Sequence, residues 1–131
     1  MESVILEEWF AVTPKVLYRA WLDSEAHGAF TGGEAEIDPV PGGAFSAWDG
    51  YISGTTLVLD PPQRIEQSWR TTDFPPDAPD SRLVLELHAE RRGTRLVLRH
   101  TEMPEGQGAE YAQGWIDHYF EPMKVYFRTA R

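Results

Sequence analysis

The sequence contains no cysteine, and this absence excludes several kinds of chemistry. A chain without thiols has no disulfide, no cysteine nucleophile and no thiolate ligand for a metal. Disulfides are rare in reducing compartments, so the composition fits the cytoplasm. We therefore expect a cytoplasmic protein, and its 131 residues suffice for one domain with its own core, residues 1–131.

Long apolar runs and basic segments are also lacking. No stretch approaches the roughly 20 apolar residues that cross a bilayer, and the N-terminal Met-Glu-Ser-Val has no basic region typical of a secretory signal. We therefore expect neither a membrane-spanning helix nor a secretory signal. Only 12 lysines and arginines stand against 21 acidic residues, giving a net charge of −9. This charge repels nucleic acid and favours a cationic ligand or a basic protein surface, unless it serves solubility alone.

Signatures of catalysis and metal binding are scarce. The glycine pairs lack the spacing of a phosphate-binding loop, and no serine lies in a nucleophile elbow. The four histidines, His27, His88, His100 and His118, are isolated from one another in the sequence. No pair has the spacing of a preformed metal site. We therefore expect no catalytic residue, no metal and no cofactor.

The last segment, from Gln107 to Thr129, has the strongest pattern in the chain. Large apolar side chains recur there every three or four residues, namely Tyr111, Trp115, Tyr119, Met123 and Tyr126. This spacing predicts one long helix with an aromatic face, which Ile116, Phe120 and Phe127 widen by one position. Pro122 lies inside the pattern. It lacks an N–H, so we expect the helix to kink or loosen there.

The N-terminal part predicts one strand followed by two short helices. Residues 4–12 are apolar apart from Glu7 and Glu8 and suit a strand. Thr13 and Pro14 are a typical N-cap and first turn. Asp23 or Ser24 caps a second helix, which we expect to end near Gly28.

The middle of the chain, residues 34–101, predicts a series of strands. Side chains alternate between apolar and polar there, as along Arg64–Thr71, which places Ile65, Gln67 and Trp69 on one face. Asp49-Gly50 separates two strand-like runs, and this pair favours a type I′ turn. The sequence therefore predicts an α+β protein. A curved antiparallel sheet of about six to seven strands is expected to wrap around the long C-terminal helix, with two short helices after the first strand.

A few polar residues fall on the face of the sheet that we expect to point inward. His100 shares its strand face with leucines, and Gln67 lies between Ile65 and Trp69. Each could meet a ligand or form hydrogen bonds within the core. Glu8 and Glu66 do not share an inward face in this pattern, so we do not expect a carboxylate pair.

An ordered set of short motifs gives the chain a family likeness. The motifs run nearly from end to end, as follows: Pro14 with Leu17-Tyr18-Arg19-Ala20; Ala29-Phe30-Thr31; Gly42-Gly43-x-Phe45; Asp49-Gly50-x-x-Ser53-Gly54; Pro61; Trp69-Arg70; Gly114-Trp115-x-x-x-Tyr119-Phe120-Glu121; and Lys124. In these positions the chain resembles the C-terminal domain of the activator of the ninety-kDa heat-shock-protein ATPase. That domain belongs to the START-like, birch-pollen-allergen-like superfamily.

The resemblance implies a helix-grip fold with a cavity between the sheet and the long helix. Relatives in the superfamily bind lipids, polyketides or hormones, and the co-chaperone acts in the stress response with a further N-terminal domain, which this chain does not match.

Three functions follow as hypotheses. The leading one is binding of a small apolar molecule, lipid-like or aromatic, by a monomer or homodimer that is non-enzymatic or weakly enzymatic. The residues expected to line the pocket are Phe45, Ile52, Gln67, Trp69, Leu85, Leu98, His100, Trp115, Tyr119 and Met123. The second is a protein-interaction module with a heat-shock chaperone as its partner. The third is an enzyme of the polyketide cyclase type that uses His100 or Tyr119 as an acid–base group.

Overall fold

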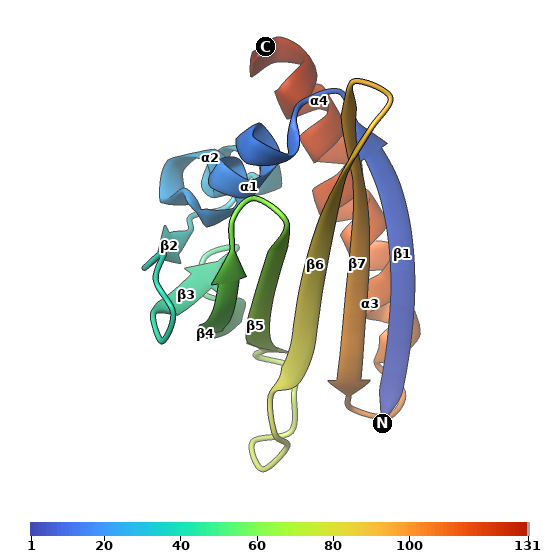
Figure 1. Cartoon of the computed structure of the whole chain (residues 1–131). Coiled ribbons are helices and arrows are strands. Elements are labelled where there is room, and N and C mark those ends of the chain that lie inside the picture. The colour runs from blue at the N-terminus through green and yellow to red at the C-terminus, as the bar shows by residue number, and fades with distance from the viewer. Residues whose placement is uncertain (131) are drawn as a thin grey trace.

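The fold consists of one sheet and a set of helices that cover one of its faces (Figure 1). The structure is a computed structural model and describes the backbone of residues 1–130 and the side chains of residues 1–128. The strands are β1 (Glu2–Phe10), β2 (Glu36–Ile37), β3 (Ala44–Ala47), β4 (Ile52–Asp60), β5 (Arg64–Thr71), β6 (Ser81–Glu90) and β7 (Gly93–Met103). The helical segments are α1 (Pro14–Leu22), α2 (Ser24–Thr31), α3 (Gly108–Gly114), the π-helical η1 (Trp115–Phe120) and α4 (Glu121–Ala130).

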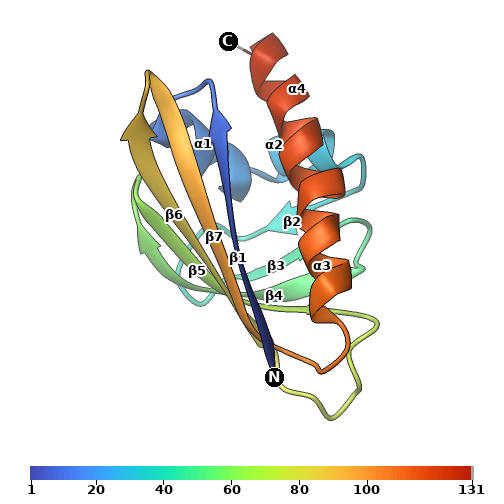
Figure 2. The same ribbon diagram turned by 90° about the vertical axis from the view of Figure 1, so that its right-hand side faces the viewer.

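The seven strands form an antiparallel sheet in the order β1-β7-β6-β5-β4-β3-β2. Its register places Gln67, Leu83 and His100 opposite one another on three neighbouring strands. Seen from the side, the sheet curves toward the helix α3–η1–α4, which runs across its concave face (Figure 2). The predicted α+β helix-grip architecture is confirmed.

The two short helices begin where the sequence indicates. Thr13 accepts a hydrogen bond from the N–H of Val16, and Asp23 accepts one from the N–H of Ala26 at 2.9 Å. The predicted end of the second helix near Gly28 is wrong. Gly32 ends it instead, because a glycine adopts the left-handed conformation of a C-cap (φ 81°) without steric cost.

The long C-terminal helix loosens where the proline predicts. Pro122 cannot donate to the carbonyl of His118, and the preceding residues form a π-helical turn in which the N–H of Glu121 donates to Ile116. Phe120 is buried as expected. Ile116 is 36% exposed, so its predicted place on the buried stripe is wrong. A π-helical turn holds more residues than an α-helical turn, and this turns the Ile116 side chain away from the sheet.

The core lies between the concave face of the sheet and the helices. Phe10 from β1 contacts the rings of Phe120 and Phe127 edge to face, with centroids 6.1 and 6.0 Å away. Leu85 and Leu98 are fully buried beneath the helix. Edge-to-face pairs of this kind add to the free energy that burial alone contributes.

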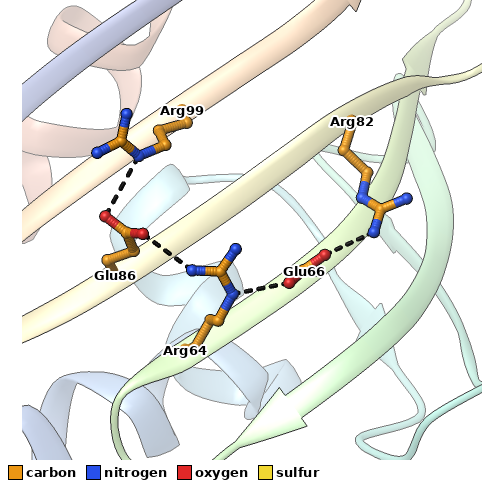
Figure 3. A network of polar contacts seen from close by, with 5 residues as sticks. All are labelled: Arg64, Glu66, Arg82, Glu86 and Arg99. Atoms are coloured by element: carbon orange, nitrogen blue, oxygen red, sulfur yellow. Dashed lines mark hydrogen bonds and ion pairs between the residues drawn. The ribbon is translucent and has the colours of Figure 1, made fainter.

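The convex face of the sheet carries a chain of ion pairs (Figure 3). Glu66 lies between Arg64 and Arg82, and Glu86 lies between Arg64 and Arg99, with Arg64 atoms 2.7 and 2.9 Å from the two carboxylates. Arg82 and then Arg64 hold the pKa of the Glu66 carboxyl below its usual range. Glu66 is therefore an outward structural residue, as the alternation of side chains predicts.

The β3–β4 hairpin has an unusual backbone. Asp49 and Gly50 have φ values of 58° and 87°, and the N–H of Tyr51 donates to the carbonyl of Trp48. Positive φ at both central residues is the predicted type I′ geometry. Trp48 also has a positive φ of 53°, which is an outlier for a bulky side chain.

Because Gly50 is left-handed, we expect Gly50→Val to destabilise the protein by about 1 kcal/mol or more. A Cβ at this position meets no atom within 4 Å, so the cost comes from the backbone alone. The matched control is Gly50→Asn, since asparagine tolerates this conformation. Thermal unfolding of both variants checks the prediction. Equal melting temperatures for Gly50→Val and the parent contradict the assigned turn.

Candidate functional site

One hydrogen-bonded histidine connects the long helix to the sheet. The indole N–H of Trp115 donates to Nδ1 of His100 at 3.0 Å, and the other ring nitrogen lies 2.8 Å from Oγ of Ser81. An indole nitrogen only donates, so Nδ1 must be unprotonated and Nε2 must carry the proton. The Ser81 hydroxyl in turn donates to the carbonyl of Trp69. Every polar atom of this buried group therefore has a partner.

A second histidine connects the helix to α2. Nδ1 of His27 lies 2.8 Å from the carbonyl of Trp21, which only accepts, so Nδ1 carries the proton. Nε2 then accepts from the hydroxyl of Tyr119 at 2.8 Å. The Tyr119 ring also contacts those of Trp21 and Trp115, with centroids 5.2 and 4.8 Å apart.

Both buried histidines are held neutral. Burial lowers the pKa of His27 to about 4 and that of His100 to about 3, because a charged imidazolium loses its hydration inside the core. Burial also raises the pKa of the Tyr119 hydroxyl. A general acid or base near neutral pH needs a pKa close to the operating pH and access to a substrate. The geometry of these groups is that of structural hydrogen bonds.

A cleft opens between the tip of the β3–β4 hairpin and the helix. Its outer part has a volume of about 580 Å³, and its narrow inner end has about 40 Å³. The residues that line both parts are Trp48, Tyr51, Tyr111, Gly114 and His118. The inner end is additionally lined by Ile52, Trp69, Trp115 and Tyr119.

The walls of the cleft are aromatic. The Trp48 ring contacts His118 on the helix and Tyr51 on its own hairpin, with centroids 4.6 and 5.7 Å apart. A Cβ on Gly33 would come within 2.5 Å of the Trp48 ring, so this glycine allows the ring to lie across the backbone. The Tyr111 hydroxyl is fixed at 2.6 Å from both Thr71 and Gln107.

The mouth of the cleft is acidic. Asp49, Glu110 and Asp117 line the outer part, and no lysine or arginine with a described side chain does so. Beside it, the hydroxyl of Tyr51 donates to Asp73 at 2.7 Å. Among residues 1–128, none of these four carboxylates forms an ion pair with a lysine or arginine.

The structure brings together only some of the predicted pocket residues. Ile52, Trp69, Trp115 and Tyr119 meet at the inner end of the cleft. Trp69 and Trp115 contact each other directly, with centroids 5.6 Å apart and no space for a ligand between them. Phe45 faces a separate surface depression beyond β3. The remaining predicted residues are packed in the core and do not border the cleft: Gln67, Leu85, Leu98, His100 and Met123.

The polar side chains that the sequence singles out interact with other residues of the protein. Gln67 accepts from the indole N–H of Trp21 at 3.3 Å and donates to Thr56 at 3.2 Å. Glu8 forms an ion pair with Lys124 at 3.1 Å, while Glu66 lies on the convex face. The two carboxylates are therefore apart, as predicted.

The sequence pattern does not indicate the outer residues of the cleft. Trp48 and Tyr51 flank Asp49-Gly50, and two aromatic residues beside an exposed turn were the available signal. His118 lies at the rim of the cleft, next to the aromatic stripe of the helix. The partners of these side chains come from segments that are distant in the sequence.

The described residues meet neither the requirements of a membrane-spanning helix nor those of a cluster of metal ligands. Within residues 1–130, no helix has both the length and the apolar character needed to cross a bilayer. In the same part of the chain, no group of three or more metal-ligating side chains comes together.

The curved sheet, the helix that it grips and the cleft at its edge define a helix-grip domain of the START-like class. Residues 11–128 match the family described as activator of Hsp90 ATPase homolog 1-like protein, and the chain belongs to this family.

Curated relatives cover the chain almost completely. The human activator of 90 kDa heat shock protein ATPase homolog 1 is 30% identical over 125 residues, which make up 95% of this chain and 37% of that protein. The homologue of Dictyostelium discoideum is 24% identical over 96% of this chain and 33% of its own length. The chain thus spans about a third of the length of these relatives.

Solved structures agree with this fold. An HSP90 activator from Plasmodium falciparum superposes with a TM-score of 0.87 and 27% identity, covering 95% of each chain. CalU16 from Micromonospora echinospora gives a TM-score of 0.81 and 26% identity over 95% of this chain and 75% of that one.

The two neutral histidines predict a marked loss of stability in weak acid. In the unfolded chain a histidine has a pKa near 6.5, so below this pH the unfolded state binds protons that the folded state does not. The stabilisation is fully present above pH 6.5 and is lost as the pH falls toward about 4 for His27 and about 3 for His100. At most two protons differ, so the free energy of unfolding should fall by up to about 2.7 kcal/mol per pH unit.

Urea unfolding between pH 7 and pH 5 measures this slope. His100→Gln should reduce it by about one proton, since glutamine does not titrate. His88→Gln, on an exposed part of the convex face, should leave it unchanged and serves as the control. A free energy of unfolding that is constant over this range contradicts the neutral state of both buried rings.

Proposed function

We propose that this protein is a binding module whose site is the aromatic cleft, and that its ligand is a small molecule with a flat apolar body. The observation that carries the proposal is the aromatic lining of the cleft, whose outer part of about 580 Å³ narrows to an apolar inner end of about 40 Å³. Sites for small molecules are concave and mostly apolar, with a few polar groups. The outer part has the size of such a site.

The hydrogen bonds of the buried histidines and of Tyr119 support binding without catalysis. His100 and His27 are neutral, buried and hydrogen-bonded on both ring nitrogens. The Tyr119 hydroxyl is used in the bond to His27. A cyclase-type reaction with His100 or Tyr119 as the acid–base group would require these bonds to break, so we place this hypothesis behind binding. The filled core also favours a ligand that enters from the edge over a long chain enclosed beneath the helix.

A substitution at Gly114 tests the cleft without damage to the core. Gly114 has helical φ and ψ angles of −61° and −40°, and the nearest atom to a Cβ there is 4.0 Å away. Gly114→Leu should therefore occupy the cleft, and the removal of a helical glycine should stabilise the protein by up to about 1 kcal/mol. The control is Gly114→Ala, which gains the same helix propensity and adds only a methyl group.

Three probes share a flat naphthalene ring system and differ in the charge of its substituent. They are the cation (2-naphthylmethyl)trimethylammonium, the neutral 2-naphthaleneacetamide and the anion 2-naphthaleneacetate. At least one should change tryptophan fluorescence saturably and raise the melting temperature of the parent and of Gly114→Ala. Free ligand at one hundred times Kd should stabilise by about 2.7 kcal/mol, and Gly114→Leu should abolish the response. The proposal is wrong if no probe binds the parent, or if Gly114→Leu binds as well as Gly114→Ala.

A second candidate function is assistance to the ATPase cycle of a heat-shock chaperone. It is favoured by the 30% identity to the human activator over 95% of this chain. The chain, however, spans only 37% of that relative, so the interaction surfaces of the whole relative need not all be present.

We expect this chain alone to leave the ATP turnover of a 90 kDa heat-shock chaperone from the same organism nearly unchanged. An ATPase assay at micromolar protein measures the effect, with Gly114→Leu in parallel to reveal any role of the cleft. Several-fold stimulation by the parent would reverse the order of the two proposed functions.

A further inference from the structure

We infer that the cleft selects an organic cation, in which an ammonium or quaternary ammonium group is attached to the flat apolar body. The inference rests on the proposed function and names the chemical class of its ligand. It is carried by the separation of charge over the surface, by the aromatic walls and by the backbone of Trp48.

Charge is distributed unequally between the cleft and the convex face. On the convex face, Arg64, Arg82 and Arg99 neutralise Glu66 and Glu86 (Figure 3). Glu7 and Glu90 are likewise paired there with Arg95. The excess negative charge of the chain must therefore lie elsewhere.

The cleft is one place where unpaired negative charge gathers. Asp49 and Asp117 accept hydrogen bonds from neutral donors only, namely the backbone N–H of Glu34 at 2.8 Å and the side-chain amide of Gln113 at 3.0 Å. A hydrogen bond from a neutral group brings no positive charge to offset that of the carboxylate. Asp49, Asp117 and Glu110 therefore create a negative potential at the opening, which attracts a cation and repels an anion.

The aromatic walls supply a second source of attraction for a cation. Trp48, Tyr51 and Tyr111 line both the outer and the inner part of the cleft. The faces of aromatic rings carry partial negative charge and bind ammonium groups, with tryptophan the strongest of the three ring types. A neutral aromatic molecule gains only the apolar contact. An organic cation gains this contact together with the attraction to the rings and to the carboxylates.

The backbone of the hairpin indicates that the position of Trp48 is maintained at a cost. A tryptophan with φ 53° is strained, and such outliers concentrate at binding sites. The Trp48 ring lies against His118, and Gly33 leaves room for it. The opposite wall includes η1, and π-helical turns are likewise frequent at functional sites.

The three naphthalene probes test the charge preference because they share one ring system. At low ionic strength (2-naphthylmethyl)trimethylammonium should bind at least tenfold more tightly than 2-naphthaleneacetamide, and 2-naphthaleneacetate should bind most weakly. Added salt should weaken the binding of the cation and leave that of the amide nearly unchanged, because salt screens charge and not apolar contact. Titration of tryptophan fluorescence in 10 mM and 300 mM sodium chloride measures both effects.

A double variant assigns the preference to the mouth of the cleft. Glu110→Gln with Asp117→Asn should reduce the affinity for the cationic probe at least fivefold and change that for the amide by less than twofold. The control is Glu7→Gln with Glu25→Gln, which removes the same charge from positions that do not line the cleft. This control should retain the full preference.

The outcomes separate the inference from the proposed function. Equal affinities for the cation and the amide, both lost in Gly114→Leu, overturn the charge preference and leave the binding site in place. A preference that falls equally in the two double variants also overturns it, because net charge alone would then account for it. If none of the probes binds, the proposed function fails together with the inference.

Discussion

The structure depends on the hydrogen bonds that the polar groups of its buried aromatic side chains form. Trp115 and Tyr119 bring an indole N–H and a hydroxyl into a region without water, where each needs an acceptor. His100 on β7 and His27 on α2 provide these acceptors. The two hydrogen bonds connect the middle of the long helix to the sheet on one side and to a short helix on the other. They fix where along the sheet the helix lies, and with it the wall of the cleft.

The π-helical turn reconciles a proline with this arrangement. Pro122 leaves the carbonyl of His118 without its usual donor, and the wider turn before it changes the direction of the side chains. Trp115 and Tyr119 remain inward, while Asp117 and His118 lie on the outer side, where they border the cleft. The same irregularity thus serves the core and the site.

The distribution of charge has a physical reason in the exposure of the sheet. One face of the antiparallel sheet is covered by helices and the other meets water, so most outer positions of β5, β6 and β7 are polar. Arginine and glutamate alternate there and neutralise one another, as with Arg64 and Glu66. Among the side chains of residues 1–128, no lysine or arginine lines the outer part of the cleft between the hairpin tip and the helix. The carboxylates near the cleft affect the ionisation of its side chains. The pKa of the Tyr111 hydroxyl is raised, mainly by burial, and the charges of Asp73 and Glu110 raise it further.

The sequence by itself determined the elements and their inward faces, because these follow from local rules of period, capping and turn chemistry. The Thr13 and Asp23 caps, the Asp49-Gly50 turn, the alternation around Trp69 and the loosening before Pro122 are all of this kind. Only the tertiary structure decided which polar groups meet and where space remains. The partners of His100 lie 15 and 19 residues away, and Tyr119 lies 92 residues from His27. No local pattern specifies such pairs, because they depend on how a curved sheet and a bent helix fit together. For the same reason the inner residues Leu85, Leu98 and Met123 fill the core, and the cleft opens beside them at Trp48.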